Sequence, residues 1–426
     1  MAVWQQLFTR RMLICVFTGF ASGLPLYLLL NLVPAWLHTE HIDLKVIGAF
    51  TLIQFPYTWK FLWSPLLDRY VVPVLGRRRG WMLLTQIALL LVIAALGGFS
   101  PQSDLGIIVL LATLLAFLSA TQDIALDAYR RELLSDNELG LGNAVHVNAY
   151  RIAGLIPGSL SLILADFFPW NMVFIITALF MLPGIAMTLM VQEPQRVAPP
   201  KTLREAVIEP FHEFITRQGW RGALLVLAFL FFCKLGDSLC TALATPFYLD
   251  MGFSKSQIGL IAKNAGLWPA VIGALLGGIW MLKLGINRAL WLFGIVQVVS
   301  IFGFYWLAAQ GSHTEITALH LTQLAFVIGL EAFGVGLGTA AFVAYIAHTT
   351  HPAYTATQFA LFTSLAAVPR TFVNATAGWL VEQMDWSGFF LLCATLAMPG
   401  MLLLFKVAPW GETQPVSETP PFGKTQ

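Results

Sequence analysis

Charged side chains are scarce in this chain of 426 residues: Asp, Glu, Lys and Arg make up 11% of it, whereas 58% of the residues are apolar. An ordinary water-soluble domain carries about 25% charged residues, because its surface must be hydrated. A soluble chain of this length would fold into several domains, and there are too few charges to coat them. The composition therefore excludes a soluble protein and predicts an all-α integral membrane protein.

Cysteine is also rare, and there is no excess charge of either sign, since the formal net charge is +2. The four cysteines lie inside apolar stretches without the spacing of metal ligands, so we expect them to pack as small apolar side chains. They are Cys15, Cys233, Cys240 and Cys393. A nearly neutral chain gives no indication of a nucleic-acid partner. We expect neither a metal nor a cofactor.

Long apolar runs, in contrast, are abundant. A bilayer core about 30 Å thick requires about 20 apolar helical residues, and twelve such runs are separated by loops with charged residues, Gly or Pro. We expect membrane-spanning helices at 11–37, 44–67, 80–98, 105–129, 140–165, 170–190, 221–249, 256–282, 288–309, 316–346, 353–381 and 386–408. The first run has no small-residue cleavage site after a short apolar core, so we expect it to remain as an anchor.

A polar linker at 191–220 divides these runs six and six. The expected organisation is an N-terminal half at 1–190, a C-terminal half at 221–408 and a polar tail at 409–426. With the N-terminus in the cytoplasm, 17 of the 24 Lys and Arg residues fall in cytoplasmic regions, which agrees with the positive-inside rule. We therefore expect both termini, the linker and the tail to lie in the cytoplasm.

The two halves also resemble each other weakly. Pro34-Ala-Trp-Leu and Asp43-Leu-Lys-Val-Ile-Gly48 parallel Pro246-Phe-Tyr-Leu and Ser254-Lys-Ser-Gln-Ile-Gly259. Two six-helix halves with the same topology are typical of the major facilitator architecture, in which the halves rock around a central cavity. We expect helices one, four, seven and ten to line that cavity. A fold does not define a function, so the function must come from the residues.

Carboxylates at membrane depth are costly unless they face water or a partner, so each is a candidate site residue. Asp123 and Asp127 lie four residues apart in the fourth run, which places both on one helix face, about 6 Å apart. Two like charges at this separation favour protonation of one of them, as proton coupling requires. Asp127 has an alternative role in a salt-bridge cluster with Arg130 and Arg131.

Two further carboxylates lie in the C-terminal half. Asp237 follows Lys234 by three residues, so the two could simply neutralise each other. Glu331 has no cation on its own helix and must either find one across the bundle, with Lys263 and Arg370 as candidates, or be protonated. Both carboxylates are therefore further candidates for proton coupling.

More cations lie inside the expected helices than Glu331 requires, which favours an anionic substrate. Arginine, lysine, amide and ring groups can together bind carboxylates and sugar hydroxyls. The candidate substrate-binding residues are Lys60, Gln122, Tyr150, Arg151, Lys234, Arg370 and Asn374, with Tyr27 and Trp268 as rings for sugar stacking. Trp36 is a weaker candidate, because a Trp near a helix end is more often an anchor at the membrane interface.

Other polar patterns indicate structure rather than chemistry. His348 and His351 have no acidic or Cys ligand beside them and are expected in a solvated loop. The glycines of Gly334-Val-Gly336 and 273–278 lie inside apolar runs and follow no strand, so they are not phosphate-binding loops. We expect them to allow close helix packing.

Several strings in this sequence are more specific than its composition. They are Phe20-Ala-Ser-Gly-Leu-Pro25, Ile42-Asp-Leu-Lys, Lys60-Phe-Leu-Trp-Ser-Pro-Leu-Leu-Asp-Arg-Tyr70, Gly76-Arg-Arg-Arg-Gly-Trp81, Ser119-Ala-Thr-Gln-Asp-Ile124, Asp127-Ala-Tyr and Ala356-Thr-Gln-Phe-Ala-Leu361. In this order the chain resembles the AmpG muropeptide permease family of the major facilitator superfamily, from about residue 12 to about residue 405.

The resemblance implies import of 1,6-anhydromuropeptides across the bacterial inner membrane by proton symport. The implied biology is peptidoglycan recycling, with an indirect influence on β-lactamase induction. The superfamily loop signature would be Asp68-Arg69 followed by Gly76-Arg77-Arg78-Arg79, with an insertion at 70–75. Its implied role is a gate on the cytoplasmic side. The expected partners are the substrate, protons and lipid, and we expect a monomer.

Proteins of other classes fit the sequence less well. A membrane-embedded enzyme would need a nucleophile, base or metal cluster at one interface, and the loops offer none. A channel would have rings of one charge or a filter loop, whereas the buried charges here are mixed. Among transporters, an importer of a siderophore or of another anionic metabolite stays the alternative, since some relatives of similar length look like siderophore permeases.

Overall fold

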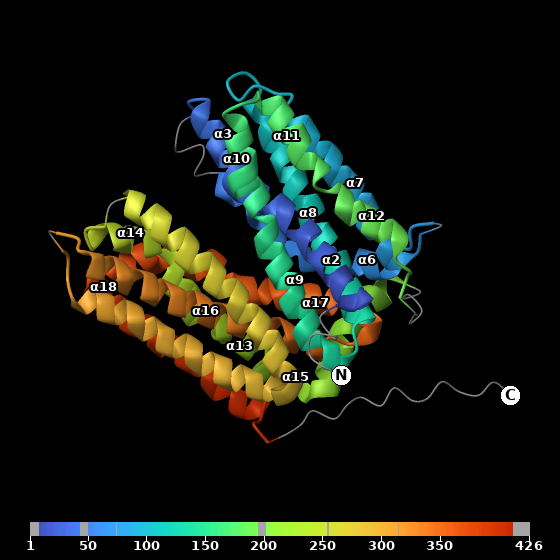
Figure 1. The fold of residues 1–426 in the computed structure, drawn as a ribbon. Coiled ribbons are helices and arrows are strands. Elements are labelled where there is room, and N and C mark those ends of the chain that lie inside the picture. The colour runs from blue at the N-terminus through green and yellow to red at the C-terminus, as the bar shows by residue number, and fades with distance from the viewer. Residues whose placement is uncertain are drawn as a thin grey trace.

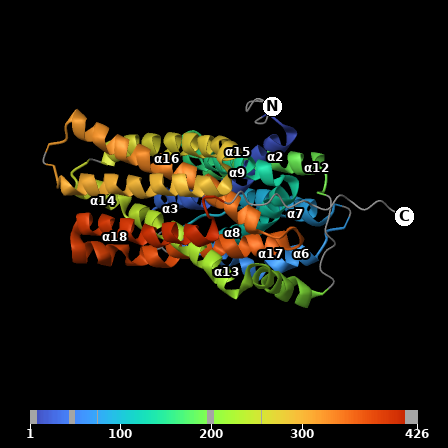
Figure 2. The same ribbon diagram turned by 90° about the horizontal axis from the view of Figure 1, so that it is seen from below.

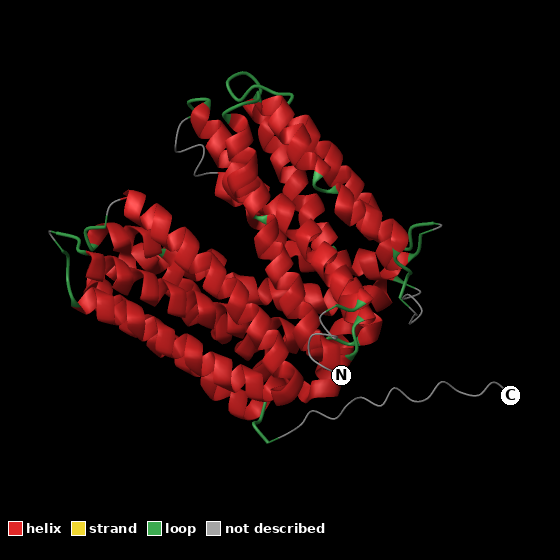
Figure 3. Cartoon of the chain, in the orientation of Figure 1, coloured by secondary structure: helices red, strands yellow, loops and turns green. Residues whose placement is uncertain are grey.

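The computed structural model describes residues 8–42, 50–73, 75–194, 202–253, 255–313 and 315–411. The start of the second expected span, part of the linker and the tail beyond 411 lie outside the described residues. Throughout the described ranges the regular structure is helical (Figure 3), apart from one isolated β-bridge between Val72 and Gly76. The expected all-α fold is confirmed.

The N-terminal half contains helices of several lengths, including short 3-10 and π segments. In chain order these are α2 (Arg10–Tyr27), η1 (Leu28–Leu32), α3 (Val33–Thr39), η2 (Phe50–Gln54), α5 (Phe55–Trp59), η3 (Lys60–Leu62), α6 (Ser64–Arg69), α7 (Arg77–Leu96), α8 (Leu105–Leu133), η4 (Asp136–Glu138), α9 (Leu139–Ala153), η5 (Ile156–Leu160), α10 (Ser161–Ala165), α11 (Trp170–Leu179) and α12 (Leu182–Met190).

The C-terminal half has fewer and longer helices. They are α13 (Leu203–Ala242), α14 (Ala244–Asp250), α15 (Lys255–Ala309), α16 (Ala318–Thr349), η6 (Pro352–Tyr354), α17 (Thr355–Val368), η7 (Pro369–Val373), η8 (Asn374–Thr376) and α18 (Ala377–Val407).

Nine helices among the described residues are long and apolar enough to cross a membrane. Three of the long helices each consist of two helical segments, because a non-helical residue interrupts α13 at Gly219, α15 at Gly285 and α18 at Asp385. The two glycines have φ values of 69° and 73°, which glycine adopts without strain. Divided at these residues, α15 supplies the eighth and ninth expected spans, and α18 supplies the end of the eleventh and the whole twelfth.

The second expected span is not one helix. From Phe50 to Arg69 the chain forms the short elements η2, α5, η3 and α6. Pro56 and Pro65 each lie in the first turn of a short helix, where the missing backbone N–H costs least. The prolines thus divide the apolar run into short helices, none of which is long enough to be a membrane span by itself.

The linker expected at 191–220 contains a helix that the sequence analysis did not predict. Residues 203–218 form the first part of α13, before the break at Gly219. Gln358 of α17 donates its side-chain amide to the Pro210 carbonyl oxygen (2.9 Å) and to Glu213 Oε2 (2.7 Å). The linker is therefore attached to the C-terminal half.

Glycines allow the helices of each half to approach closely. A Cβ atom on Gly19 would overlap the His146 carbonyl oxygen, and one on Gly23 would overlap that of Tyr150, so α2 packs backbone against backbone on α9. In the other half, a Cβ on Gly336 would overlap the Ala270 carbonyl oxygen. In lipid there is no hydrophobic driving force between helices, so they associate through van der Waals packing. Small residues favour this packing because they let the backbones approach closely. The predicted packing role of the glycines is confirmed at Gly336.

The two halves share their apolar core at one end and have separate cores at the other. One cluster joins Met12, Cys15 and Ala144 to Phe229 and Phe362 across the halves. At the opposite end, one cluster contains N-terminal residues alone and another contains C-terminal residues alone. Figures 1 and 2 show the two bundles meeting where α8 and α16 end and diverging toward α3, α10 and α14. We call the shared end, where α8 and α16 end and α7 begins, the gated end.

Two expectations on apolar side chains have different outcomes. Cys15, Cys240 and Cys393 are buried and unpaired, as expected, whereas Cys233 is only partly buried. The preferred interfacial role of Trp36 is wrong: its side chain is 1% exposed and lies 4.9 Å, centroid to centroid, from Phe174. Trp36 is buried because α11 covers it.

Replacing Gly336 by Ala should destabilise the C-terminal half, since the new methyl group would overlap the Ala270 carbonyl oxygen and lie 2.8 Å from the Ala274 nitrogen. Backbone atoms cannot move away as a flexible side chain can, so we expect a loss of about 1–3 kcal/mol. Thermal unfolding of the detergent-solubilised protein measures it. Gly378→Ala is the control, because nothing lies within 4 Å of a Cβ there. Equal unfolding temperatures for both variants would contradict the packing role.

Candidate functional site

Buried charges gather in three places. The first, which we call the N-half cluster, comprises Lys60, Asp123, Asp127 and Arg130. The second, the C-half cluster, comprises Lys234, Asp237 and Glu331. The third, the gate, lies at the gated end around Asp68 and Arg78.

In the N-half cluster, α8 supplies both carboxylates and Arg130. Asp127 accepts a hydrogen bond from Arg130 Nη2 at 2.8 Å, and Lys60 Nζ lies 3.9 Å from its other oxygen. Arg130 also donates from Nε to Asn143 Oδ1 (2.7 Å), and it is 2% exposed. Asp127 is therefore ion-paired in this structure, which corresponds to the salt-bridge alternative for this residue.

Asp123 lies one turn away, and within the described part of the chain it has no ion pair within 4 Å. Its Oδ1 instead accepts a hydrogen bond from the Ser22 hydroxyl at 2.6 Å, while the charges of Lys60 and Asp127 act on it from further away. The adjacent Gln122 is fully buried and donates to the Ala21 carbonyl oxygen (2.7 Å). Gln122 therefore joins α8 to α2 and does not face open space in this state.

The C-half cluster is more loosely connected. Lys234 Nζ donates to Thr339 Oγ1 at 3.2 Å and lies 5.4 Å from the centre of the Phe342 ring. Of the ion pairs within 4 Å among the described residues, none joins Lys234 to Asp237 or involves Glu331. Glu331 is nevertheless 9% exposed and feels the charges of Asp237 and Lys234. Among the described side chains of their own half, Lys234 is the cation whose charge acts on both carboxylates.

Arg151 of α9 links the halves at this level. Its Nη1 donates to the Ala270 carbonyl oxygen of α15 at 2.8 Å, and its charge acts on both Glu331 and Asp237. The Tyr27 ring lies 5.4 Å from that of Tyr150, next to Arg151 in the chain. Among the described residues, Arg151 and Lys234 are the cations whose charges act on Glu331.

The remaining candidates lie at the edges of this region. Asn374 in η8 accepts a hydrogen bond from the Ser238 hydroxyl at 3.2 Å. Trp268 on α15 is 53% exposed, so its ring is free to contact a ligand or lipid. The side chains of Lys263 and Arg370 lie outside the described residues.

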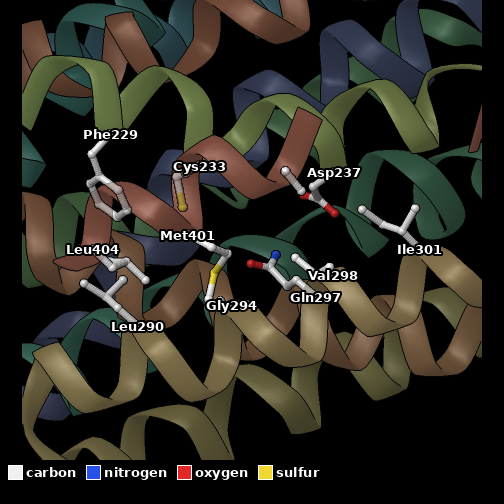
Figure 4. Close-up of a pocket in the computed structure, with 13 residues that line it drawn as sticks. Phe229, Cys233, Asp237, Leu290, Gly294, Gln297, Val298, Ile301, Met401 and Leu404 are labelled. Atoms are coloured by element: carbon white, nitrogen blue, oxygen red, sulfur yellow. The ribbon is translucent and has the colours of Figure 1, made fainter. Parts of the chain in front are cut away.

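A small cavity opens beside Asp237, inside the C-terminal half. It measures about 30 Å³ and lies between α13, α15, α16 and α18 (Figure 4). Asp237 and Gln297 are polar residues among mostly apolar walls that include Phe229 and Met401. A water molecule needs about 10–15 Å³ of such space, so the cavity has room for water next to the carboxylate.

The gate is centred on Arg78, whose side chain is 1% exposed. Its Nη2 donates to Asp68 Oδ1 and to Glu132 Oε1, both at 2.7 Å, and also reaches the Thr355 hydroxyl of the C-terminal half. Thr355 donates in turn to Glu132 at 2.6 Å. Arg77 completes the group with an ion pair to Glu132 at 3.3 Å.

Asp68 also binds the first turn of α17. Its Oδ2 accepts hydrogen bonds from the Thr357 backbone N–H (2.9 Å) and hydroxyl (2.8 Å). The first N–H groups of a helix have no partner within the helix, and the helix dipole favours an anion there. Asp68 of one half therefore caps a helix of the other half.

For the other two residues of the predicted gate, the structure gives contacts within the N-terminal half. Arg79 donates to the Thr188 and Leu189 carbonyl oxygens of α12, within its own half. Arg69 lies 5.7 Å from the Tyr70 ring centre. Of the predicted set, Asp68 and Arg78 contact the other half directly, and Arg77 supports them through Glu132.

Several polar residues that complete the gate were not among the predicted site residues. Glu132 follows the Arg130-Arg131 pair at the end of the fourth span, and Thr355 and Thr357 lie in or beside a string that was noted only for its resemblance. Glu193 accepts hydrogen bonds from the backbone N–H groups of Arg78 (2.8 Å) and Arg79 (3.0 Å). Glu193 follows α12, 115 positions after Arg78, so nothing local in the sequence indicates this contact.

The described residues contain no group of three or more His, Cys, Asp or Glu side chains able to hold a metal ion. What the arrangement offers instead is buried charge in each half, with a closed polar contact at one end. Buried charges in packed membrane helices are typical of a transporter, and the Major Facilitator Superfamily sequence profile matches residues 15–371. The chain belongs to this superfamily, whose members are transporters and not enzymes.

Relatives narrow the assignment. An uncharacterized protein of Haemophilus influenzae is 54% identical over 95% of this chain and 96% of its own length. The anhydromuropeptide permease of Escherichia coli K12 is 43% identical over 92% of this chain and 79% of its own length. The resemblance to the AmpG permease family is thereby confirmed, and the chain belongs to that family.

Solved structures agree on the fold. The proton:xylose symporter XylE superposes with a TM-score of 0.69 over 94% of this chain and 95% of that protein, at 12% sequence identity. Identity this low shows a shared fold and nothing about the ligand.

Replacing Asp68 by Asn should open the gated end, because the neutral amide loses the charge-assisted bonds to Arg78 and to the start of α17. Such bonds contribute about 1.5–3 kcal/mol each, so the open population should rise about tenfold or more. Spin labels at Tyr70 and Glu209, one in each half, would report longer distances. Asp104→Asn is the control, since Asp104 accepts hydrogen bonds from the Ser100 backbone N–H and the Ser103 hydroxyl, both in its own half and away from the gate. An unchanged distance distribution in Asp68→Asn would show that other contacts hold the gate closed.

Proposed function

We propose that this protein imports 1,6-anhydromuropeptides from the periplasm into the cytoplasm, driven by protons moving in the same direction. The observation that carries the proposal is the 43% identity to the Escherichia coli anhydromuropeptide permease over 92% of this chain. The buried cations support it, because an anionic disaccharide-peptide needs cationic and aromatic partners.

The proposed orientation places the gated end in the cytoplasm of a bacterium and the protein in the inner membrane. Basic residues concentrate at that end, with Arg77, Arg78, Arg79, Arg130 and Arg131 among them, and the positive-inside rule assigns such ends to the cytoplasm. With this orientation, the closed gate and the separate cores of the opposite end correspond to a state that is closed to the cytoplasm.

The proposed binding region lies between the two clusters. Arg151, Lys60 and Lys234 would hold substrate carboxylates, with Arg370 and Asn374 beyond them. Tyr27, Tyr150 and the exposed Trp268 would stack against sugar faces. Arg151 donates a hydrogen bond to the opposite half and lies within range of the charges of Glu331 and Asp237 in that half. This position supports a role for Arg151 as a substrate contact that is coupled to both halves.

The charges of the two clusters support coupling of a proton to an anion. The N-half cluster holds two cations, Lys60 and Arg130, and two carboxylates, Asp123 and Asp127. Arg151 and the C-half cluster likewise bring two cations together with Asp237 and Glu331. With all carboxylates ionised each group is neutral, so adding one proton leaves a net charge of +1, which one substrate carboxylate balances. The low dielectric of the membrane interior makes the neutral combinations the favourable ones.

Asp123 is the proposed primary proton carrier, because it is held by a neutral hydroxyl whereas Asp127 already has Arg130. Glu331 and Asp237 would carry the proton within the C-terminal half, where the cavity has room for water beside Asp237. In this mechanism, Asp127 stays paired with Lys60 and Arg130 while Asp123 takes up and releases the proton.

Uptake of labelled GlcNAc-anhydromuropeptide into proteoliposomes tests the proposal. We expect accumulation above the external concentration only with an inward proton gradient, and no accumulation of a ferric siderophore. Gradient-driven siderophore uptake with no muropeptide uptake would replace this function with the alternative one. Thermal unfolding of the reconstituted protein checks that it is folded in both cases.

Asp123→Asn should abolish accumulation but leave exchange of labelled for unlabelled substrate, because the amide cannot release a proton while its hydrogen bond with Ser22 can persist. The loss should reduce the final concentration ratio to about one. Asp104→Asn, in an exposed loop where Asp104 bonds to Ser100 and Ser103, is the matched control and should accumulate normally. Normal accumulation by Asp123→Asn would remove this residue from the coupling mechanism.

A further inference from the structure

A second pocket lies at the gated end of the C-terminal half, away from both clusters. Its volume is about 240 Å³, and its walls are formed by the part of α13 around the break at Gly219 and by the C-terminal ends of α16 and α18. Its polar lining includes Arg217, Tyr345, His348 and Lys406. The proposed transport mechanism uses none of these residues.

The charges of this pocket favour an anion. Arg217 is held in place by Glu213 (Nε to Oε1, 2.6 Å) and by the Thr349 carbonyl oxygen (Nη2, 2.8 Å). Glu213 also accepts a hydrogen bond from Gln358, and because it neutralises Arg217, the excess positive charge of the pocket comes from Lys406. Lys406 has no ion pair or hydrogen bond in the part of the chain that the structure describes. The pocket thus contains an ordered guanidinium group and an ammonium group that is available to a ligand. Together they can donate charge-assisted hydrogen bonds to the oxygens of a phosphate.

The surroundings of the pocket are those of a membrane interface. Its floor continues into apolar residues, Leu225 and Val226 on α13. Beside it, Trp220, Leu224 and Phe405 are exposed by 65%, 50% and 65%. In a membrane-spanning chain, exposed Leu and Phe contact acyl chains, and an exposed Trp at a span end lies at the headgroup level. A ligand in this pocket would contact cations with its polar end and apolar side chains with the rest of the molecule.

We propose that this pocket binds the phosphate headgroup of an anionic glycerophospholipid from the membrane leaflet at the gated end. Basic pockets between the ends of membrane helices are suited to such headgroups. A free phosphate would use the cations but not the apolar floor, so the lipid is the occupant that uses both. The bound lipid would join α13 to α16 and α18, which all belong to the C-terminal half.

Native mass spectrometry of the full-length protein in detergent, titrated with phosphatidylglycerol, tests this site. Removing one headgroup contact costs about 1 kcal/mol, so we expect Lys406→Gln to weaken phosphatidylglycerol binding about fivefold. Lys406 is exposed and unpaired, so the variant should fold. Lys283→Gln removes an equally exposed lysine from α15, outside the pocket, and should bind like the unmodified protein.

Two further arms separate the possible occupants. Phosphatidylcholine, whose headgroup carries no net charge, should bind at least about fivefold more weakly than phosphatidylglycerol, and inorganic phosphate at millimolar concentration should not displace the lipid. Displacement by inorganic phosphate would make this a site for a free anion, and equal losses in Lys406→Gln and Lys283→Gln would reduce the effect to general surface charge. Either result overturns the lipid proposal. Because binding is measured without transport, its failure leaves the proposed import function untouched.

Discussion

The cost of an uncompensated charge in the membrane is the constraint on which the rest of this structure depends. With few water molecules to solvate it, each buried ion must find an opposite charge or a set of hydrogen bonds. In this structure, buried ions lie in groups with equal numbers of cations and carboxylates, such as Lys60 and Arg130 with Asp123 and Asp127. A neutral group of this kind is stable when empty and becomes receptive to an anion only when it takes up a proton. The same constraint that makes the fold possible therefore supplies a physical basis for proposed symport.

The gate satisfies this constraint in a way that allows it to open. All of its formal charges, Arg77, Arg78, Asp68 and Glu132, belong to the N-terminal half, whereas the C-terminal half contributes threonine hydroxyls and the start of α17. When the halves separate at this end, the ion pairs stay together and no charge is left alone on either side. Water replaces hydrogen bonds to neutral groups, which costs far less than separating an ion pair in a low dielectric.

Much of the fold could be predicted from the sequence, because apolar run length and the placement of basic loops follow directly from membrane thickness and topogenesis. The candidate acids could be found for the same reason, since an ionised residue in an apolar run is conspicuous. Partners were harder: Arg151 is separated from Glu331 by 180 positions in the chain, and nothing local indicates that α9 packs on α15. The role of Glu132 was missed because its partner Thr355 lies in the other half. The burial of Trp36 was missed because it depends on packing against α11.

The contact between α9 and α15 shows how the two halves could move without losing it. Small residues form it: a Cβ on Gly278 would lie 3.3 Å from the Gly140 carbonyl oxygen, and Ala144 lies against the same turn. Such surfaces have few protruding side chains to interlock, so they can pivot while staying in van der Waals contact. Arg151 lies at one end of this contact and bonds to a backbone carbonyl of α15, a partner that any small rotation would shift. A substrate carboxylate that competes for Arg151 would release that bond, and occupancy of the site would thereby be linked to the angle between the halves.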